Sequence, residues 1–250
     1  MKKVIALHAS KRKRNTYNLL VQIQQELARN DVEVEIISLY DYKIQSCFGC
    51  ETCIIHDNCI HNDDVELLMN KMMAADGIIL SSPVYLQQVS GTLKSLIDRT
   101  CKWYHRPALY GKPVLCVATT KGSGLKSTLS YLQSVAVQWG AMPIGGIGRT
   151  IRNSKVPVSK KELSGFLKLL QVPESYRPPL NSLINFEVQK ALAKHLNGLD
   201  TCYWSERGWD GKPYYFACST NGFKCVISRA FGAILQRGLS HSRIKSSKKV

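Results

Sequence analysis

The sequence predicts an α/β fold in which a doubly wound sheet of five parallel strands precedes a helical C-terminal extension. Two patterns in the 250-residue chain predict it. Short apolar runs alternate with stretches of helical periodicity up to residue 150, and prolines and longer helical stretches follow. Parallel neighbours need crossover connections that cover both faces of a sheet. We therefore expect an α/β domain over residues 1–150 and a mainly helical, basic extension over residues 151–250.

The five expected strands are short runs rich in apolar residues. The first run is continuously apolar, as in a strand buried on both faces, whereas the second alternates apolar and polar residues. The third ends at Pro83, which cannot continue a hydrogen-bonded ladder. The expected strands span residues 2–9, 32–38, 77–82, 113–119 and 142–147.

Helices are expected between these strands and in the extension. Asp63 and Asp64 supply the negative charge that suits the first turn of a helix. The expected helices span residues 16–30, 63–75, 89–104, 125–139, 159–171, 180–197 and 221–237, and an aromatic loop is expected at 202–216. The last helix carries an apolar stripe that we expect to dock on the core or on a second subunit, with a membrane-surface helix as the alternative. This stripe consists of Ile227, Ala230, Phe231, Ile234 and Leu235.

Charge and hydropathy limit the function classes. No apolar stretch approaches the roughly 18 residues of a membrane-spanning helix. The first apolar run, residues 4–7, is too short for a signal segment, so we expect a cytoplasmic protein with reduced thiols. The net charge of +16 would suit an anionic partner such as a nucleic acid. We do not expect nucleic-acid binding, because the basic residues are dispersed and the aromatic loop matches no RNA or DNA motif.

A basic loop follows the first strand and precedes a helix. This loop, Ser10-Lys-Arg-Lys-Arg-Asn-Thr16, places backbone N–H groups and the positive end of a helix dipole where an anion can bind. Ser10, Asn15 and Thr16 add short donors, and Arg12 adds a planar fork that suits phosphate oxygens. The chain has neither GxxxxGK[ST] nor GxGxxG. We predict a phosphate site of another kind.

Two further loops follow the third and fourth strands. Pro83, Val84 and Tyr85 end the third strand, where a planar cofactor could lie or where the chain simply turns around a core tyrosine. The fourth strand continues into Thr119, Thr120, Lys121 and Gly122. The glycine would let the backbone approach a ligand closely, or it would only form a turn. In doubly wound sheets such loops converge at the carboxyl edge, where ligands bind.

Four cysteines lie within thirteen residues in a C-x2-C-x2-C-x5-C pattern. They are Cys47, Cys50, Cys53 and Cys59. This compact spacing favours a [4Fe-4S] cluster, with a structural zinc ion or free, redox-active thiols as alternatives. The neighbouring His56 and His61 are interpreted as solvated loop residues. Isolated cysteines are more often small buried hydrophobes, and we assign that role to Cys101, Cys116, Cys202, Cys218 and Cys225.

Four stretches of the chain together resemble a known family. They are ASKRKRNT, the cysteine loop (residues 47–59) with Asp63-Asp64, SSPVY, and LKSLIDR at residues 93–99. The resemblance, over roughly residues 1–150, is to the iron-sulfur flavoproteins and the wider NAD(P)H-dependent FMN reductase family of flavodoxin-like proteins. It implies a homodimer or homotetramer, and it marks Asp98 and Arg99 as structural or interfacial. It also implies FMN at the sheet edge, held by Ser10, Arg12, Asn15, Thr16, Pro83, Val84, Tyr85, Thr119, Thr120, Lys121 and Gly122.

The expected function is that of an FMN-dependent oxidoreductase or electron-transfer flavoprotein whose [4Fe-4S] cluster exchanges electrons with FMN. NAD(P)H is the candidate electron donor, and a redox protein or a small molecule is the acceptor. A cluster-free NAD(P)H-dependent reductase of quinones, nitro compounds or free flavin is the alternative, and a basic nucleic-acid-binding protein ranks third. No catalytic side chain is assigned, because the cofactors supply the chemistry.

Overall fold

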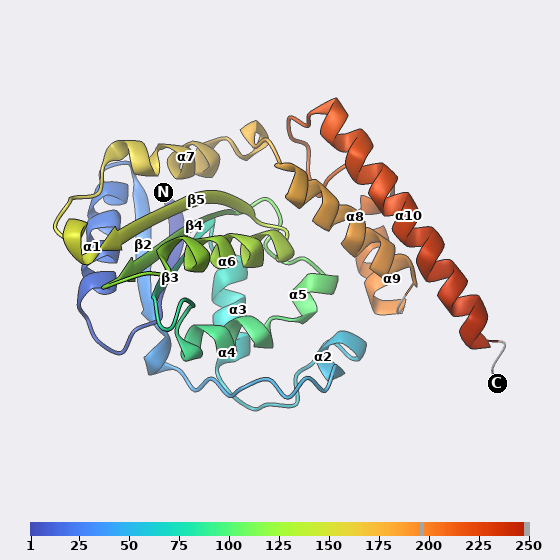
Figure 1. Ribbon diagram of the computed structural model, residues 1–250, viewed down its shortest axis with the longest axis horizontal. Helices are drawn as coiled ribbons and strands as arrows, with labels where there is room; N and C mark the ends of the chain where they lie inside the picture. The colour runs from blue at the N-terminus through green and yellow to red at the C-terminus, as the bar shows by residue number, and fades with distance from the viewer. Residues whose placement is uncertain (196–197, 248–250) are drawn as a thin grey trace.

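Five parallel strands form the centre of the computed structural model, which describes residues 1–195 and 198–247 (Figure 1). The order β2-β1-β3-β4-β5 confirms the predicted doubly wound, flavodoxin-like sheet, with strand order reversing between β1 and β3. All four strand pairs are parallel. The strands are β1 (Lys2–His8), β2 (Val32–Ser38), β3 (Gly77–Pro83), β4 (Pro113–Thr120) and β5 (Met142–Thr150).

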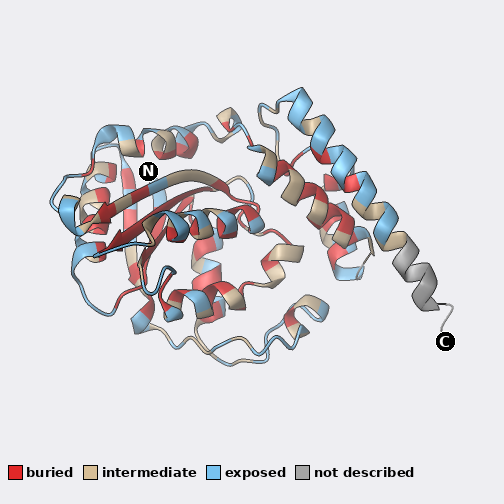
Figure 2. Cartoon of the chain, in the orientation of Figure 1, coloured by how far each residue is buried: buried red, intermediate tan, exposed pale blue. Residues whose placement is uncertain are grey.

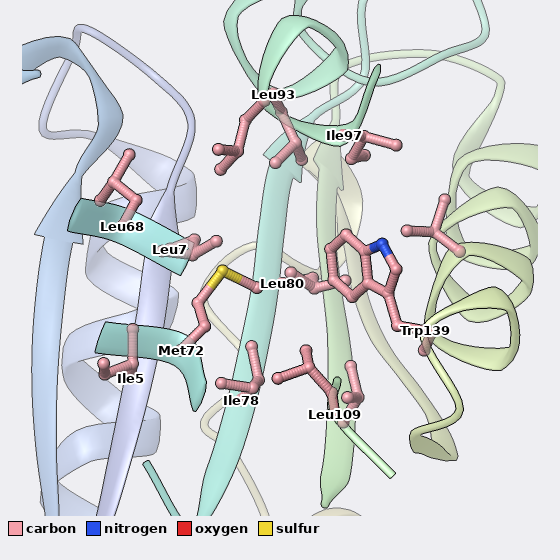
Figure 3. Packing of buried hydrophobic residues seen from close by; sticks show 14 of the residues in the cluster. Ile5, Leu7, Leu68, Met72, Ile78, Leu80, Leu93, Ile97, Leu109 and Trp139 are labelled. Carbon is pink, nitrogen blue, oxygen red and sulfur yellow. The ribbon is translucent and has the colours of Figure 1, made fainter. Parts of the chain in front are cut away.

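Helices cover both faces of the sheet, because alternate residues of each strand point to opposite faces. Ile5 and Leu7 of β1 belong to one apolar cluster, whereas Val4 and Ala6 belong to the other. Figure 3 shows the first cluster, in which Met72 and Trp139 pack against β1, β3 and β4. The helices α3 (Val65–Ala74), α4 (Gly91–Arg99) and α6 (Leu125–Gln138) cover that face, and α1 (Asn15–Ala28) and α7 (Lys160–Gln171) cover the other.

The helix α7 lies beyond residue 150 but still covers one face of the sheet. Its residues Leu163, Phe166 and Leu170 belong to the same buried cluster as strands β1 and β4. Ser159 begins α7 with a capping box, because its side chain accepts from the Glu162 amide and the Glu162 carboxylate accepts in return. The division of the chain at residue 150 stays a prediction.

The structure differs from the predicted helices in four places. The last helix, α10 (Gly222–Ser247), continues beyond the predicted end at residue 237. The predicted helix 89–104 is two helices, α4 and α5 (Lys102–His105), separated where Thr100 bonds back to the Ile97 carbonyl. The cysteine loop contains one unpredicted turn of helix, α2 (Thr52–Ile55). Part of the predicted aromatic loop is helical, since its first residues belong to α9 (Gly198–Glu206). Packing of the buried Trp204 stabilises this helix. The short 3₁₀ helices are η1 (Leu39–Asp41), η2 (Ile151–Asn153), η3 (Pro173–Ser175) and η4 (Trp209–Gly211).

The helices α8 (Leu180–His195), α9 and α10 (Gly222–Ser247) lie together at one end of the sheet (Figure 1). An aromatic cluster holds α8 and α9 there, with Phe186, Trp204 and Tyr215 in mutual ring contact. Met142, at the amino end of β5, belongs to the same cluster. The extension therefore packs near the amino ends of the strands, opposite the edge where ligands bind.

The apolar stripe on α10 does not dock on the core, so that prediction is wrong. Phe231 is 44% exposed and Ile234 69% exposed, and Figure 2 shows the outer side of α10 as largely exposed. The inward side instead carries small residues, Ser228 and Gly232. A side chain at Gly232 would come within 2.9 Å of Glu187 on α8, so the small residue permits the close approach of the two helices. Docking on a second subunit stays a prediction.

None of the described helices combines the length and the apolar composition needed to cross a bilayer. Residue 197, at the end of one predicted helix, lies outside the described residues.

Candidate functional site

Three loops meet at the carboxyl edge of the sheet and enclose a cavity of about 320 Å³. They follow β1, β3 and β4, on both sides of the position where strand order reverses. Every residue predicted to bind the cofactor lines this cavity except Gly122. The lining consists of Ser10, Arg12, Arg14, Asn15, Thr16, Pro83, Val84, Tyr85, Thr119, Thr120 and Lys121.

The loop after β1 presents the start of α1 to this cavity. No side chain caps the α1 N-terminus, and its first turn contains no acidic residue. The Ser10 hydroxyl accepts the Arg12 amide at 3.3 Å, which turns the backbone toward the helix. Arg12 and Arg14 both line the cavity. A helix N-terminus with two guanidinium groups is suited to a phosphate. Sequence reasoning missed Arg14, although it belongs to the same basic run.

The other two loops are joined to the first by hydrogen bonds. The Thr16 and Thr119 hydroxyls lie 2.6 Å apart in a buried contact, and the Val84 amide donates to the Thr119 carbonyl at 2.8 Å. The three loops therefore form one wall. Gly122 does not line the cavity, contrary to the prediction. Its amide instead donates to the Thr120 hydroxyl at 3.1 Å.

The turn after Tyr85 holds an unusual backbone. Leu86 and Gln87 have φ values of 45° and 71°, a left-handed conformation that costs non-glycine residues free energy. Gly124, with φ of 85°, packs against this turn, and a Cβ there would come within 2.8 Å of the Gln87 Cα. Two loops far apart in sequence thus hold Tyr85, 46% exposed, at the cavity.

His8 lies at the end of β1, directly before the basic loop that leads into α1. Neither ring nitrogen has a hydrogen-bond partner among the described residues, and the ring contacts Tyr17 edge to face. Burial, followed by the positive charge of Lys13, lowers the pKa of His8. The histidine therefore stays neutral in the folded chain at pH values where the unfolded chain takes up a proton.

The pKa of His8 is lower in the folded chain than in the unfolded chain. We expect this difference to reduce the stability of the fold below about pH 6.5, because protonation of His8 there favours the unfolded chain. The His8 contribution to the free energy of unfolding should rise with pH from the lowered pKa up to about 6.5 and then level off. His8→Leu should remove this part of the pH dependence. Urea denaturation of both proteins at about pH 5 and about pH 7.5 measures it, and equal pH dependence in the two proteins would contradict the assignment.

The predicted metal ligands line a second cavity, of about 200 Å³. Cys47, Cys50, Cys53 and Cys59 all border it. Two of the sulfurs already accept hydrogen bonds, since the Gly49 amide donates to Cys47 Sγ at 3.4 Å and the Thr52 hydroxyl to Cys50 Sγ at 3.3 Å. Within the described residues, no three Cys, His, Asp or Glu side chains are placed to hold a single metal ion.

A fifth cysteine borders the same cavity. Cys101 Sγ lies 3.3 Å from Cys53 Sγ, so its interpretation as an isolated hydrophobe is wrong. The Cys101 hydrogen bond lowers the pKa of Cys53, burial opposes the shift, and the positive charges of Lys102 and Arg106 assist it. A lowered pKa favours the thiolate, the form that binds metals. The 48-residue separation in sequence hid this pair from spacing arguments.

Arg99 joins the two residues that flank the cysteine loop, Gln45 and Asp63, which together form the neck of the loop. Its guanidinium donates to the Gln45 carbonyl at 3.0 Å, before the loop, and to both Asp63 carboxylate oxygens, at 2.6 and 3.0 Å, after it. Asp63 also accepts the Gln45 amide at 2.9 Å. Burial alone would raise the pKa of Asp63, but these hydrogen bonds lower it overall. Arg99 is therefore structural, and Asp63 pairs with it in addition to preceding α3.

The two cavities share no lining residue within the described part of the chain. The first brings two arginines and the α1 N-terminus together with the exposed ring of Tyr85, and the second collects thiols.

Comparison with known proteins agrees with this arrangement. A family model described as NADPH-dependent FMN reductase matches residues 2–154, which include all three loops and the cysteine loop. An iron-sulfur flavoprotein of Archaeoglobus fulgidus is 30% identical over 219 residues, 84% of this chain and 100% of the relative.

The chain belongs to the NADPH-dependent FMN reductase family.

The predicted family is thereby confirmed, and this member of the FMN reductase family is an FMN-dependent flavoprotein oxidoreductase. Another relative, an iron-sulfur flavoprotein of Methanocaldococcus jannaschii, is 42% identical over 140 residues, 53% of this chain and 70% of the relative.

Solved structures confirm the fold. A structure of a flavone reductase aligns with a TM-score of 0.52 at 14% identity and covers 68% of this chain and 62% of its own. A structure of RosB with a bound intermediate, 8-demethyl-8-formylriboflavin-5'-phosphate, aligns with a TM-score of 0.52 at 13% identity. That alignment covers 89% of this chain and 92% of the RosB chain.

If Arg12 binds the FMN phosphate as predicted, Arg12→Ala should weaken FMN binding by about 1.5–3 kcal/mol, because it would remove a charge-assisted hydrogen bond. This corresponds to about 10- to 150-fold in Kd, measured by quenching of flavin fluorescence. Lys11→Ala is the matched control, since Lys11 belongs to the same loop but does not line the cavity. Riboflavin, which has no phosphate, should bind both variants equally. An unchanged FMN affinity in Arg12→Ala would contradict the phosphate role.

Proposed function

We propose that this protein is an FMN-dependent oxidoreductase in which Cys47, Cys50, Cys53 and Cys59 hold a [4Fe-4S] cluster that exchanges electrons with FMN. The observation that carries the proposal is the convergence of all four cysteines on one cavity. The relatives named as iron-sulfur flavoproteins support it.

The chemistry of the cysteine cavity fits a cluster. Thiolates are the usual ligands of iron-sulfur clusters, and hydrogen bonds to their sulfurs adjust the reduction potential. Cys47, Cys50 and Cys53 each have a donor within 3.4 Å. In a cube each cysteine binds its own iron corner, so the sulfurs need not meet around one ion as the ligands of a zinc site do.

The residues of the first cavity would place the flavin. Ser10, Arg12 and the α1 amides would bind the phosphate, and Tyr85 would lie along the ring. Lys121, also in the lining, would place a positive charge where the reduced ring becomes anionic. FMN can exchange electrons singly or in pairs and the cluster would exchange them singly, so the two cofactors together would connect a two-electron donor to a one-electron acceptor. We propose NAD(P)H as the two-electron donor and a redox protein or small molecule as the acceptor.

Assembly into a homodimer or homotetramer belongs to the same proposal. The flavin and cysteine cavities of one chain share no lining residue among those described. A neighbouring copy could therefore bring a cysteine cavity closer to a flavin than its own chain does.

Purification without oxygen, followed by counts of iron, sulfide and flavin, tests the proposal. We expect one FMN and about four irons per chain, with bands that bleach on reduction. Addition of NADH or NADPH should reduce the flavin. Flavin without iron would contradict the cluster and leave a cluster-free reductase. A colourless chain that does not take up added FMN would contradict the whole assignment.

A further inference from the structure

A buried ion pair joins the C-terminal extension to the sheet layer beside the cysteine loop. Asp200 of α9 is fully buried, and its carboxylate accepts a hydrogen bond from Arg106, whose side chain is 7% exposed. His105 Nδ1 lies 3.1 Å from the other oxygen of Asp200. Both partners are therefore shielded from water, where an ion pair needs close geometry to persist.

The same arginine binds the backbone that carries Cys53. Arg106 Nη2 donates to the Cys53 carbonyl at 2.7 Å, and Nη1 donates to the Ile54 carbonyl at 3.1 Å. These carbonyls lie at the end of α2, a four-residue helix that is too short to be stable by itself. Arg106 Nη2 also lies 3.3 Å from the Asp57 carboxylate. A single guanidinium thus binds both α2 and the residues that follow it.

The helix α9 holds the Arg106 segment by two further hydrogen bonds. Trp204 Nε1 donates to the His105 carbonyl at 2.9 Å, and the Tyr203 hydroxyl donates to the Pro107 carbonyl at 2.7 Å. Trp204 is fully buried in the aromatic cluster of the extension. Figure 1 shows α5 beside both α2 and α9. The contacts therefore run without a gap from the aromatic cluster to Cys53.

We propose that the C-terminal extension positions the cysteine loop through this Arg106–Asp200 bridge. The part of the proposal that concerns iron rests on the proposed function. Arg106 binds the Cys53 carbonyl itself, so a rotation of α2 that breaks this bond moves the Cys53 sulfur in the cavity. Asp200 fixes the direction of the guanidinium, because it binds Nη1 from the side of the extension. Arg106 and Asp200 are positioning residues that lie outside the ligand set.

The test is Asp200→Asn in the full chain, which keeps the size of the side chain and removes its charge. We expect faster hydrogen–deuterium exchange of the amides at 50–57 in the cofactor-free chain, with unchanged exchange in the strands. In the reconstituted protein, a chelator should remove iron about 10- to 100-fold faster, the range typical of residues that orient metal ligands. FMN content should stay the same. The EPR spectrum of the reduced cluster should also change, which a general loss of stability would not cause.

Asp210→Asn is the matched control, because Asp210 is exposed in the same extension and accepts a hydrogen bond from Ser205. It should behave as the wild type. If Asp200→Asn does not fold, Arg106→Lys replaces it, since lysine keeps the charge but cannot bind both carbonyls and Asp200 in one plane.

Unchanged exchange at 50–57 in the folded variant would overturn the bridge, whatever the iron content. A wild-type chain that holds no iron would instead contradict the proposed cluster. The exchange comparison of the cofactor-free chains would still decide the bridge, so the two failures are distinguishable.

Discussion

Replacing Cys50 with alanine is expected to abolish the proposed iron-sulfur cluster while FMN stays bound. One iron corner would lose its thiolate, and the remaining ligands cannot supply the four that a stable cube needs. Cys101 also borders this cavity, but its sulfur lies against Cys53 Sγ at 3.3 Å, and no contact with Cys50 is observed among the described residues. The flavin cavity shares no described residue with the cysteine cavity, so the flavin bands should persist. Iron, sulfide and FMN counts on protein purified without oxygen measure both effects.

The matched control for this variant is Cys202→Ala. Cys202 is exposed on α9, so its predicted burial is wrong. It does not border the cysteine cavity, so its removal should leave iron unchanged. Equal iron content in Cys50→Ala and Cys202→Ala would remove Cys50 from the ligand set. Loss of FMN together with iron would show that the two cavities depend on each other more than their separate linings indicate.

Replacing Arg99 with methionine should cause the largest loss of stability. The side chains of Arg99 and Asp63 are 3% and 1% exposed, and removal of one partner leaves a buried charge without its counter-charge. Such changes cost about 3–5 kcal/mol. The same variant should open the neck of the cysteine loop, because Arg99 binds residues on both sides of it. Urea denaturation measures the free energy of unfolding.

Lys94→Met tests whether burial causes this loss. Lys94 lies on the same helix and pairs with Asp98, but both side chains are more than 40% exposed. Exposed pairs contribute about 0.2–1 kcal/mol, so the control should lose much less stability than Arg99→Met. Similar losses in the two variants would contradict the structural role assigned to the buried pair.

The sheet was predictable from the sequence because its signals are local. Each strand is an apolar run bounded by turn residues, and the helical spacing of Leu19, Leu20, Ile23 and Leu27 marks the buried side of α1. Parallel pairing requires crossover connections of about helical length, and the apolar runs are separated by connections of that length. The same reasoning located the cavity proposed for FMN, since loops at the carboxyl ends of neighbouring parallel strands must meet. Arg14 was missed because a basic run does not reveal which of its side chains turn toward the site.

Other features depend on contacts between distant residues, which spacing does not encode. Cys101, Arg106 and Asp200 contact residues 48 to 95 positions away. On α10, periodicity located the apolar stripe that includes Phe231 but not the side that faces inward. The small residue Gly232 decides that side, because it brings α10 close to α8. Helical periodicity weighs large apolar residues, so it cannot detect a helix that packs through its small ones.

The hydrogen bonds of Arg99 to Gln45 and Asp63 close the cysteine loop into a structural unit of its own. Because Gln45 and Asp63 are joined directly, the chain between them leaves the sheet layer and returns to nearly the same point, as an Ω-loop does. Insertions, deletions or ligand exchanges within it would leave the register of the strands untouched. Changes to its cysteines should therefore alter the sulfur chemistry of the chain while the sheet and its three loops keep their arrangement.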